Sequence, residues 1–225
     1  ILDHACDCHV HVFDPDRFPY AAKRAYTPGK ASVPELRSMH RSLGMSRTVL
    51  VQPSVYGTDN ACLLDAIDQL GIEQARGVAV VNLDSVSPEE LNQLHQGGIR
   101  GIRLNLHVSG EGLQQVKQQI SAAKRLAAMP GWHLQVHAYR LCSGFTPANL
   151  ARAFYSVAPD KVLWASDWPH TGGAGGAGRK PEEIEPFRDI DNQHALNQVI
   201  RAINLAEAPQ KILVDNPARL YGFSA

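Results

Sequence analysis

Ala5-Cys6-Asp7-Cys8-His9-Val10-His11-Val12-Phe13 is the stretch on which the interpretation of the fold rests. It has the character of a strand, in which alternate side chains point to opposite faces. Strict alternation predicts three small apolar side chains on one face and three polar ones on the other: Cys8, Val10 and Val12 against Asp7, His9 and His11. In a barrel the apolar face would meet the outer helices. Both imidazoles would then point inward near the C-terminal end of the strand, where barrel active sites lie.

Further apolar stretches follow, separated by amphipathic segments typical of helices. The expected strands cover residues 5–13, 47–52, 76–81, 99–106, 132–137 and 161–167. The expected helices cover residues 33–43, 60–70, 88–95, 113–128, 147–157, 194–204 and 217–221. Repeated alternation of Val-, Ile- and Leu-rich strands with helices predicts a parallel α/β sheet, open or closed into a barrel. No linker divides the chain, so we expect one domain over residues 1–225.

The number of expected strands is too small for a closed barrel, which needs eight strands and typically about 250 residues. Either the barrel is open or incomplete, or about two strand–helix units are absent from the sequence. We favour the second interpretation: an α/β fold of the distorted (β/α)8 TIM type that lacks two such units.

The composition favours a small molecule as the partner of this chain. Lysine plus arginine equals aspartate plus glutamate at 22 each, so no net field attracts nucleic acid or an anionic membrane. No apolar run approaches the roughly 20 residues of a membrane helix, and the first residues lack the order of a signal peptide. The four cysteines show neither a disulfide framework nor zinc-ribbon spacing. We therefore expect a cytoplasmic protein with no nucleic-acid or membrane partner.

Two elements carry side chains suited to catalysis. His9 and His11 can reach one metal ion together, because neutral imidazole is a common ligand of zinc-like metals. In isolation such a pair is more often a surface or hydrogen-bonded pair. The stretch Leu163-Trp164-Ala165-Ser166-Asp167-Trp168-Pro169-His170 ends an apolar strand with a carboxylate, and Pro169 stops the strand. Asp167 can take a proton from water or complete a metal site, although a lone aspartate there is usually a turn or cap residue.

Taken together, these elements resemble the amidohydrolase superfamily, of the amidohydrolase-2 type. Within it, the chain is similar to the subgroup that includes the 2-pyrone-4,6-dicarboxylate lactonases and related lactone hydrolases. The matching stretches run through nearly the whole chain in the family's order: DCHVHVF at 7–13, VQPSVYGTDN at 51–60, GIRGIRLN at 98–105, SDWPH at 166–170 and NPARLY at 216–221.

This resemblance implies a hydrolase that opens a carboxylated cyclic ester, a lactone like 2-pyrone-4,6-dicarboxylate, with water activated by Asp167. His9 and His11 would polarise the lactone carbonyl, directly or through a metal. The resemblance leaves open whether His9, His11 and Asp167 hold one divalent ion, zinc or manganese, or whether the enzyme is metal-independent. It also leaves open a monomer or a homodimer.

The resemblance assigns further residues to the substrate. Arg103 would grip a substrate carboxylate in the bidentate way that a guanidinium allows. Tyr26 and Ser54 match hydrogen-bonding positions, Arg140 matches a second substrate arginine, and His137 lies at the end of its strand beside them. Each has a structural alternative: Arg103 as an ion-pair residue, Tyr26 as a packing residue and Ser54 as a cap.

The sequence departs from the family at two places. Ala138 runs directly into Tyr139, where the family has two more strand–helix units of roughly 60 residues that supply a further histidine and arginine. Residues 107–111 also lack an arginine that the pyrone lactonases carry, which favours either a substrate with fewer carboxylates or another lactone. Two rival functions follow: a metal-dependent decarboxylase of the same superfamily, and a catalytically inactive barrel that binds a ligand.

Overall fold

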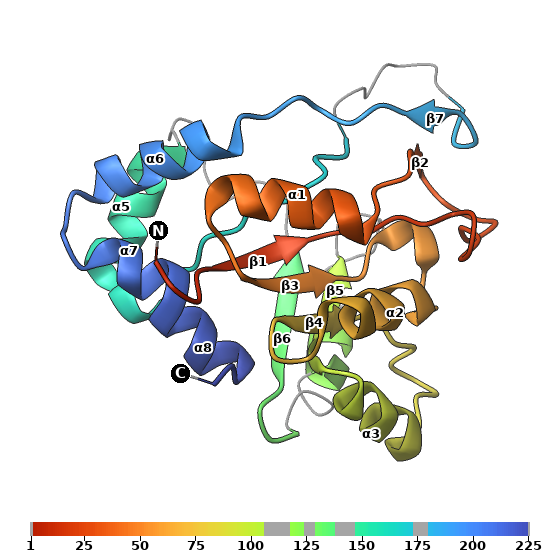
Figure 1. The fold of residues 1–225 in the computed structure, drawn as a ribbon. Coiled ribbons are helices and arrows are strands. Elements are labelled where there is room, and N and C mark those ends of the chain that lie inside the picture. The colour runs from red at the N-terminus through yellow and green to blue at the C-terminus, as the bar shows by residue number, and fades with distance from the viewer. Residues whose placement is uncertain (1, 106–117, 124–128, 138–146, 173–179, 225) are drawn as a thin grey trace.

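The computed structural model describes residues 2–105, 118–123, 129–137, 147–172 and 180–224. Its centre is a curved parallel sheet in the order β1-β3-β4-β5-β6 (Figure 1). The strands are β1 (Cys6–Val10), β3 (Arg47–Val51), β4 (Ala75–Ala79), β5 (Ile99–Asn105) and β6 (His133–His137). Strands that follow one another in sequence are neighbours in space, as in the consecutive part of a (β/α) barrel.

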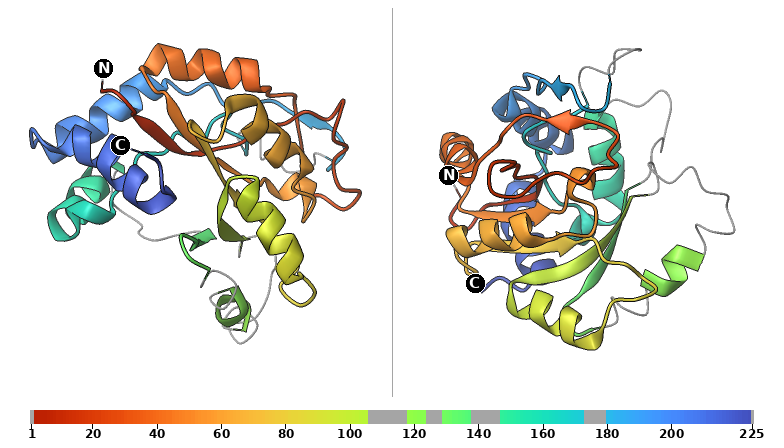
Figure 2. Two further views of the ribbon diagram at one scale, coloured as in Figure 1. Left: turned by 60° about the horizontal axis from the view of Figure 1, so that its bottom comes forward. Right: turned by 90° about the vertical axis from the view of Figure 1, so that its right-hand side faces the viewer.

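Three helices cover one face of this sheet (Figure 2). They are α1 (Val33–Leu43), α2 (Ala61–Leu70) and α3 (Pro88–Gln96), which follow β1, β3 and β4 along the chain. The Ser32 backbone N–H donates to the Glu35 carboxylate at 2.7 Å, a capping interaction that fixes the start of α1. Leu36 of α1 and Ile67 of α2 pack with Leu50 of β3 in the largest apolar cluster. Residues 118–123 are helical, within the helix expected at 113–128.

The C-terminal third forms a second group of helices at one end of the molecule (Figure 1). These are α5 (Pro147–Val157), α6 (Asn192–Ile203), α7 (Ala208–Gln210), the π-helix η3 (Lys211–Asp215) and α8 (Asn216–Tyr221). Tyr221 and Phe223 pack with Val49, Val51 and Val78, on the sheet face opposite to α1 and α2. Among the described helices, none is both long and apolar enough to span a membrane.

The prediction of strict alternation along β1 is wrong in part. The pairing with β3 shifts register between Asp7 and Val10, which is the signature of a bulge. As a result Cys8 packs in the cluster with Val49 and Tyr221, whereas Val10 packs with Leu50 on the other face. Asp7 is fully buried against His40 of α1, so it does not share a face with the two imidazoles.

The strand expected at residues 161–167 is also corrected. Lys161 ends the short helix η2 (Pro159–Lys161), and the following residues form no regular strand. They nevertheless run parallel to β1 on the side away from β3. Cys8 N–H donates to the Trp164 carbonyl at 3.0 Å, and Asp167 N–H donates to the His9 carbonyl at 2.9 Å. The segment therefore occupies the place of a barrel strand, but within the described residues β1 is its only neighbouring strand.

The sheet forms only part of a barrel. In the described part of the chain, β6 pairs with β5 alone, and the segment 162–168 lies beside β1 alone. A closed barrel would need further strands between these two edges, which is where two units were expected to be absent.

A second, small sheet lies at the far end of the molecule from α5–α8 (Figure 1). It pairs β2 (Thr27–Pro28) with β7 (Ile184–Glu185) in parallel. The Thr27 hydroxyl also donates to the Pro181 carbonyl at 2.5 Å. These contacts hold the segment that follows residue 180 against the loop that carries Tyr26, an arrangement that the sequence pattern did not predict.

Candidate active site

His9, His11 and Asp167 come together where β1 ends beside the segment 162–168. The two Nε2 atoms lie 3.3 Å apart, and the Asp167 Oδ1 atom lies 3.6 Å from His9 Nε2 and 3.5 Å from His11 Nε2. The rings of the two histidines meet edge to face at a centroid distance of 4.9 Å. Two distant parts of the chain thus present three potential ligand or proton-transfer atoms to one point.

A backbone carbonyl decides which tautomer neutral His11 adopts. Its Nδ1 atom lies 2.7 Å from the Val51 carbonyl oxygen, which can only accept a hydrogen bond. In the neutral ring the proton must therefore be on Nδ1, and Nε2 presents a lone pair toward His9 and Asp167. The pairing of β1 with β3 places His11 beside the Val51 carbonyl, so this pairing decides which nitrogen of His11 faces the site.

Asp167 is held as a carboxylate. Burial raises its pKa, but His11 in its protonated form, which carries a proton on Nε2 as well as on Nδ1, lowers it through a hydrogen bond and its charge. The charges of His9 and His170 act in the same direction, and the pKa falls to about 2. The Asp167 backbone has a φ of 62°, a left-handed conformation that is uncommon outside glycine and frequent at functional sites. This conformation lets the chain turn at once toward His170, whose N–H donates to the Asp167 carbonyl at 2.9 Å.

The three side chains fit a divalent metal ion. All their ligand atoms lie within 4.8 Å of one another. Two ligands about 2.1 Å from one tetrahedral ion are separated by roughly 3.4 Å, and the three observed separations of 3.3 to 3.6 Å match that value. Two imidazoles and one carboxylate form a donor set that suits zinc and leaves room for water or substrate.

Arg103 reaches the same region from β5. Its side chain is 7% exposed, and among the described residues its Nη1 atom donates only a long hydrogen bond of 3.5 Å, to the Gln52 carbonyl. Burial lowers its pKa, whereas Tyr26 and Asp167 act to raise it. Within the described part of the chain, the Nε atom has no hydrogen-bond partner and no carboxylate forms an ion pair with the guanidinium. The structural alternative for Arg103, an ion pair within the protein, therefore has no support among the described residues.

Tyr26 and Ser54 lie within hydrogen-bonding distance of each other. Burial raises the pKa of the Tyr26 hydroxyl, and hydrogen bonds with Ser54 and Thr171 partly offset that effect. Ser54 begins the short helix η1 (Ser54–Tyr56) after β3, so both the loop after β1 and the loop after β3 contribute. Active sites of barrels are built from such loops at the C-terminal ends of strands.

Two further expected substrate residues, His137 and Arg140, lie partly or wholly outside the described part of the chain. His137 is the last residue of β6, and its backbone pairs with Asn105 of β5. Its position at the C-terminal end of the strand agrees with the expectation, but its side chain lies outside the described part. Arg140 also lies outside the described residues.

The sequence analysis missed several residues that support the site. Asp7 Oδ1 accepts from the Ser166 N–H at 2.9 Å, and its Oδ2 lies 3.4 Å from His40 Nε2, so Asp7 ties the segment before Asp167 to β1 and α1. His170 is buried, its pKa is lowered by that burial, and its Nε2 has no partner among the described residues. Only the bulge reveals the role of Asp7, and a bulge has no clear sequence signal here.

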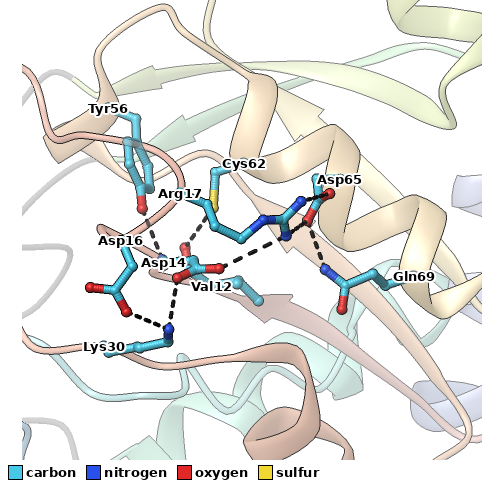
Figure 3. A network of polar contacts seen from close by, with 9 residues as sticks. All are labelled: Val12, Asp14, Asp16, Arg17, Lys30, Tyr56, Cys62, Asp65 and Gln69. Atoms are coloured by element: carbon cyan, nitrogen blue, oxygen red, sulfur yellow. Dashed lines mark hydrogen bonds and ion pairs between the residues drawn. The ribbon is translucent and has the colours of Figure 1, made fainter.

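The loop after β1 is fastened by the polar network in Figure 3. Arg17 donates two hydrogen bonds of 2.7 Å to the Asp65 carboxylate of α2, and the Asp14 N–H donates to the Tyr56 hydroxyl at 3.0 Å. Lys30 pairs with Asp14 at 2.9 Å. These contacts tie the start of the loop that carries Tyr26 to α2 and to Tyr56, and they tie the end of the loop, at Lys30, back to its start.

Comparison with known proteins finds curated relatives that align with nearly the whole chain. A 4-sulfomuconolactone hydrolase of Rhizobium radiobacter is 28% identical over 285 aligned positions, covering 97% of this chain and 90% of that protein. A 2-pyrone-4,6-dicarboxylate hydrolase of Comamonas testosteroni is 29% identical, covering 96% of this chain and 90% of that protein. The first alignment has 285 positions against the 225 residues of this chain, a difference of 60, so at least 60 residues of that relative have no counterpart here.

Solved structures show the same fold. A probable 2-pyrone-4,6-dicarboxylic acid hydrolase of Acinetobacter baumannii, with citric acid bound, superposes with a TM-score of 0.74 and 23% identity, covering 98% of this chain and 100% of that one. An amidohydrolase of Burkholderia multivorans with bound zinc gives a TM-score of 0.54 at 14% identity, covering 98% and 99% of the two chains.

The family model that matches is that of the amidohydrolases, and it covers nearly the whole chain. It does so in two segments, residues 6–142 and 139–223, which meet where two strand–helix units were expected to be absent. The matched segments contain β1 with its two histidines and the segment that ends in Asp167. This chain belongs to the amidohydrolase family.

Proposed function

We propose that this protein hydrolyses a carboxylated lactone, with His9, His11 and Asp167 as its catalytic residues. The observation that carries the proposal is the triangle of Nε2, Nε2 and Oδ1 atoms at 3.3 to 3.6 Å, assembled from β1 and the segment 162–168. The names of the curated relatives, both hydrolases of cyclic compounds that carry acidic groups, support the choice of substrate class.

The chemistry follows from the properties of the three side chains. Water forms a bond to the lactone carbonyl carbon, and its proton passes to Asp167. The ring C–O bond then breaks, and the ring oxygen takes up a proton. Because the pKa of Asp167 is about 2, its carboxylate is ionised at neutral pH but is a weak base. Polarisation of the carbonyl by His9 and His11 must therefore assist the attack.

His9, His11 and Asp167 would hold one divalent ion, zinc or manganese. When bound, such an ion lowers the pKa of a coordinated water and polarises a carbonyl, which compensates for the weak basicity of Asp167. His11 is prepared for this role, since its Nδ1 proton is engaged by the Val51 carbonyl.

Substrate recognition is assigned to Arg103, Tyr26 and Ser54, with His137 and Arg140 as further candidates. The buried Arg103 guanidinium, which lacks a carboxylate partner among the described residues, supports an anionic substrate. The Tyr26 and Ser54 hydroxyls would hydrogen-bond the ring or its substituents.

Ring opening of 2-pyrone-4,6-dicarboxylate, followed by ultraviolet absorbance with and without a chelator, tests the proposal. Turnover that a chelator abolishes and zinc or manganese restores would make His9, His11 and Asp167 metal ligands. Turnover that survives chelation would favour the metal-independent form. A failure to turn over any carboxylated lactone would contradict the proposed activity.

The substitution Asp167→Asn should reduce kcat by about 10²- to 10⁴-fold, because it removes the proton acceptor. Circular dichroism should show an intact fold. Asp84→Asn, an exposed aspartate after β4, is the matched control and should keep full activity. Retained turnover in Asp167→Asn would refute the assigned role.

The same assays separate the two rivals. Release of carbon dioxide without ring opening would identify a decarboxylase. Thermal stabilisation by a carboxylated lactone without turnover would identify an inactive ligand-binding barrel. The open side of the sheet gives this second rival its support, because the family's further histidine and arginine belong to the absent units.

We further place the enzyme in the cytoplasm, as a monomer or a homodimer. The support is the balanced charge and the state of Cys6, Cys8 and Cys62, which are buried free thiols as expected in a reducing compartment.

A further inference from the structure

We propose that Gln135 is a positioning residue that decides which ring nitrogen of His9 carries the proton. The inference rests on the proposed role of His9 at the active site. Gln135 lies on β6. If its amide has this role, substitutions of Gln135 change the zinc affinity of the site and the position of the proton on the His9 ring, and both can be measured without lactone turnover.

Gln135 is placed beside the site by the β5–β6 pairing, in which it stands opposite Arg103. Its Nε2 atom lies 3.3 Å from His9 Nδ1, across 126 residues of sequence. Its Oε1 atom is buried and has no hydrogen-bond partner among the described residues. Among the described residues, the Gln135 amide therefore forms a hydrogen bond through its nitrogen, to His9, and none through its oxygen.

His9 and His11 differ in the group behind each ring. The Val51 carbonyl behind His11 only accepts a hydrogen bond, so the proton of neutral His11 stays on Nδ1. Gln135 behind His9 offers both a donor and an acceptor at the end of one rotatable bond. His9 alone of the pair therefore has a neighbour that is compatible with either neutral form of the ring.

The observed orientation suits a site without metal. An amide N–H that donates to Nδ1 keeps the proton of neutral His9 on Nε2. That atom is 3.3 Å from His11 Nε2, which presents a lone pair, and 3.6 Å from Asp167 Oδ1. The proton on Nε2 thus sits between two acceptors.

A half-turn of the amide suits a site with metal. Oε1 would then accept from a proton on His9 Nδ1, and Nε2 would present its lone pair to the ion. The proton on Nε2 leaves to solvent while Nδ1 takes one up, so the number of protons on the ring is unchanged. Because Oε1 has no hydrogen-bond partner among the described residues, the rotation breaks, within that part of the chain, only the hydrogen bond that it replaces.

Two substitutions distinguish the role of Gln135 as a hydrogen-bond donor to His9 from its role as an acceptor. Gln135→Glu removes the donor and keeps an acceptor, so it should hold the proton on Nδ1 and tighten zinc binding by about tenfold or more. Gln135→Met removes both ends at similar volume and should weaken zinc binding by about 10- to 100-fold. Zinc affinity is measured by competition with a chromophoric chelator. Gln198→Glu, exposed on α6, adds the same charge away from the site as a control.

Nitrogen-15 NMR of histidine-labelled, metal-free protein gives a second readout. We expect His9 to carry its proton on Nε2 in the unsubstituted protein and on Nδ1 in Gln135→Glu, with His11 unchanged. Folded Gln135→Glu and Gln135→Met variants with the original zinc affinity would overturn the proposal. So would an unchanged His9 spectrum in Gln135→Glu. Neither measurement needs lactone turnover, so loss of the proposed function and loss of this inference are distinguishable.

Discussion

At the scale of single residues, Arg103 has an environment that favours a ligand over a structural role. Its guanidinium is almost fully buried, and the only hydrogen bond that it makes among the described residues is a long one to the Gln52 carbonyl. A buried charge without a partner costs folding free energy, because the interior does not replace the hydration of the ion. An anionic group of the substrate would supply the missing partner.

Arg103→Met should therefore separate stability from activity. We expect an unchanged or higher Tm, since the substitution removes a buried charge that has no ion-pair partner among the described residues. We also expect KM for a dicarboxylated lactone to rise by about 10- to 100-fold, the value of a lost charge-assisted hydrogen bond. Calorimetry and steady-state kinetics measure the two effects. Arg201→Met, on the surface of α6, controls for loss of a positive charge, and a marked fall in Tm with unchanged KM would make Arg103 structural.

The residue scale also shows where sequence patterns stop being informative. The proximity of His9, His11 and Asp167 was predictable, because parallel barrel strands bring their C-terminal ends together. The placement of Asp7 was not. A bulge adds one residue to β1 without altering its composition, so alternation predicted Asp7 beside the imidazoles while the structure places it against α1.

At the scale of elements, the apolar pattern of the sequence predicted the helices more accurately than it predicted the extended segment 162–168. The described bounds of α1, α2, α3 and α5 lie within two residues of expectation, because the apolar periodicity of these helices is strong. The segment 162–168 has the apolar composition of a strand, yet it forms only an isolated bridge with β1. A regular ladder requires neighbours, and composition alone does not reveal that one neighbour is absent.

The loop after β1 gives a prediction at this scale, through the Arg17–Asp65 pair of Figure 3. The hydrogen bond from Arg17 holds the pKa of Asp65 below its ordinary value. Ionised Asp65 thus stabilises the fold above its unfolded pKa of about 3.9, and this contribution is lost as pH falls through the lowered folded pKa. We expect Arg17→Ala to lower Tm by a few degrees near neutral pH, because exposed pairs contribute little.

Scanning calorimetry of the unsubstituted protein and of Arg17→Ala, from neutral to acidic pH, tests the direction of this pH dependence. The difference in Tm between the two proteins should shrink as pH falls below the ordinary aspartate pKa. Arg37→Ala is the matched control: Arg37 donates to the Gln69 backbone carbonyl at 2.8 Å, which does not titrate. A constant difference for Arg17→Ala across the whole range would contradict the role of Asp65.

At the scale of the whole molecule, the dominant feature is the unclosed side of the sheet. The strand count predicted it, because eight strands are needed to close this barrel and the sequence supplies fewer. The consequence for the surface could not be predicted from the sequence. Val136 on β6 is 42% exposed, and Phe154 and Val157 on α5 are 51% and 85% exposed. Phe154 and Val157 border a groove with Val162 and Leu163, beside the other edge of the opening.

Unpaired strand edges and clustered exposed apolar side chains favour association between molecules. We therefore expect the sedimentation coefficient to rise with protein concentration across the micromolar range. Val136→Lys on the β6 edge and Val157→Lys in the groove should each reduce this association, since a lysine blocks a flat apolar contact. Ile184→Lys is the control: Ile184 is 70% exposed but lies on β7, away from both edges. If the protein sediments as a monomer at every concentration, residues of the same chain cover the open side of the sheet. If all three substitutions have equal effects, the added charge alone explains the change in association.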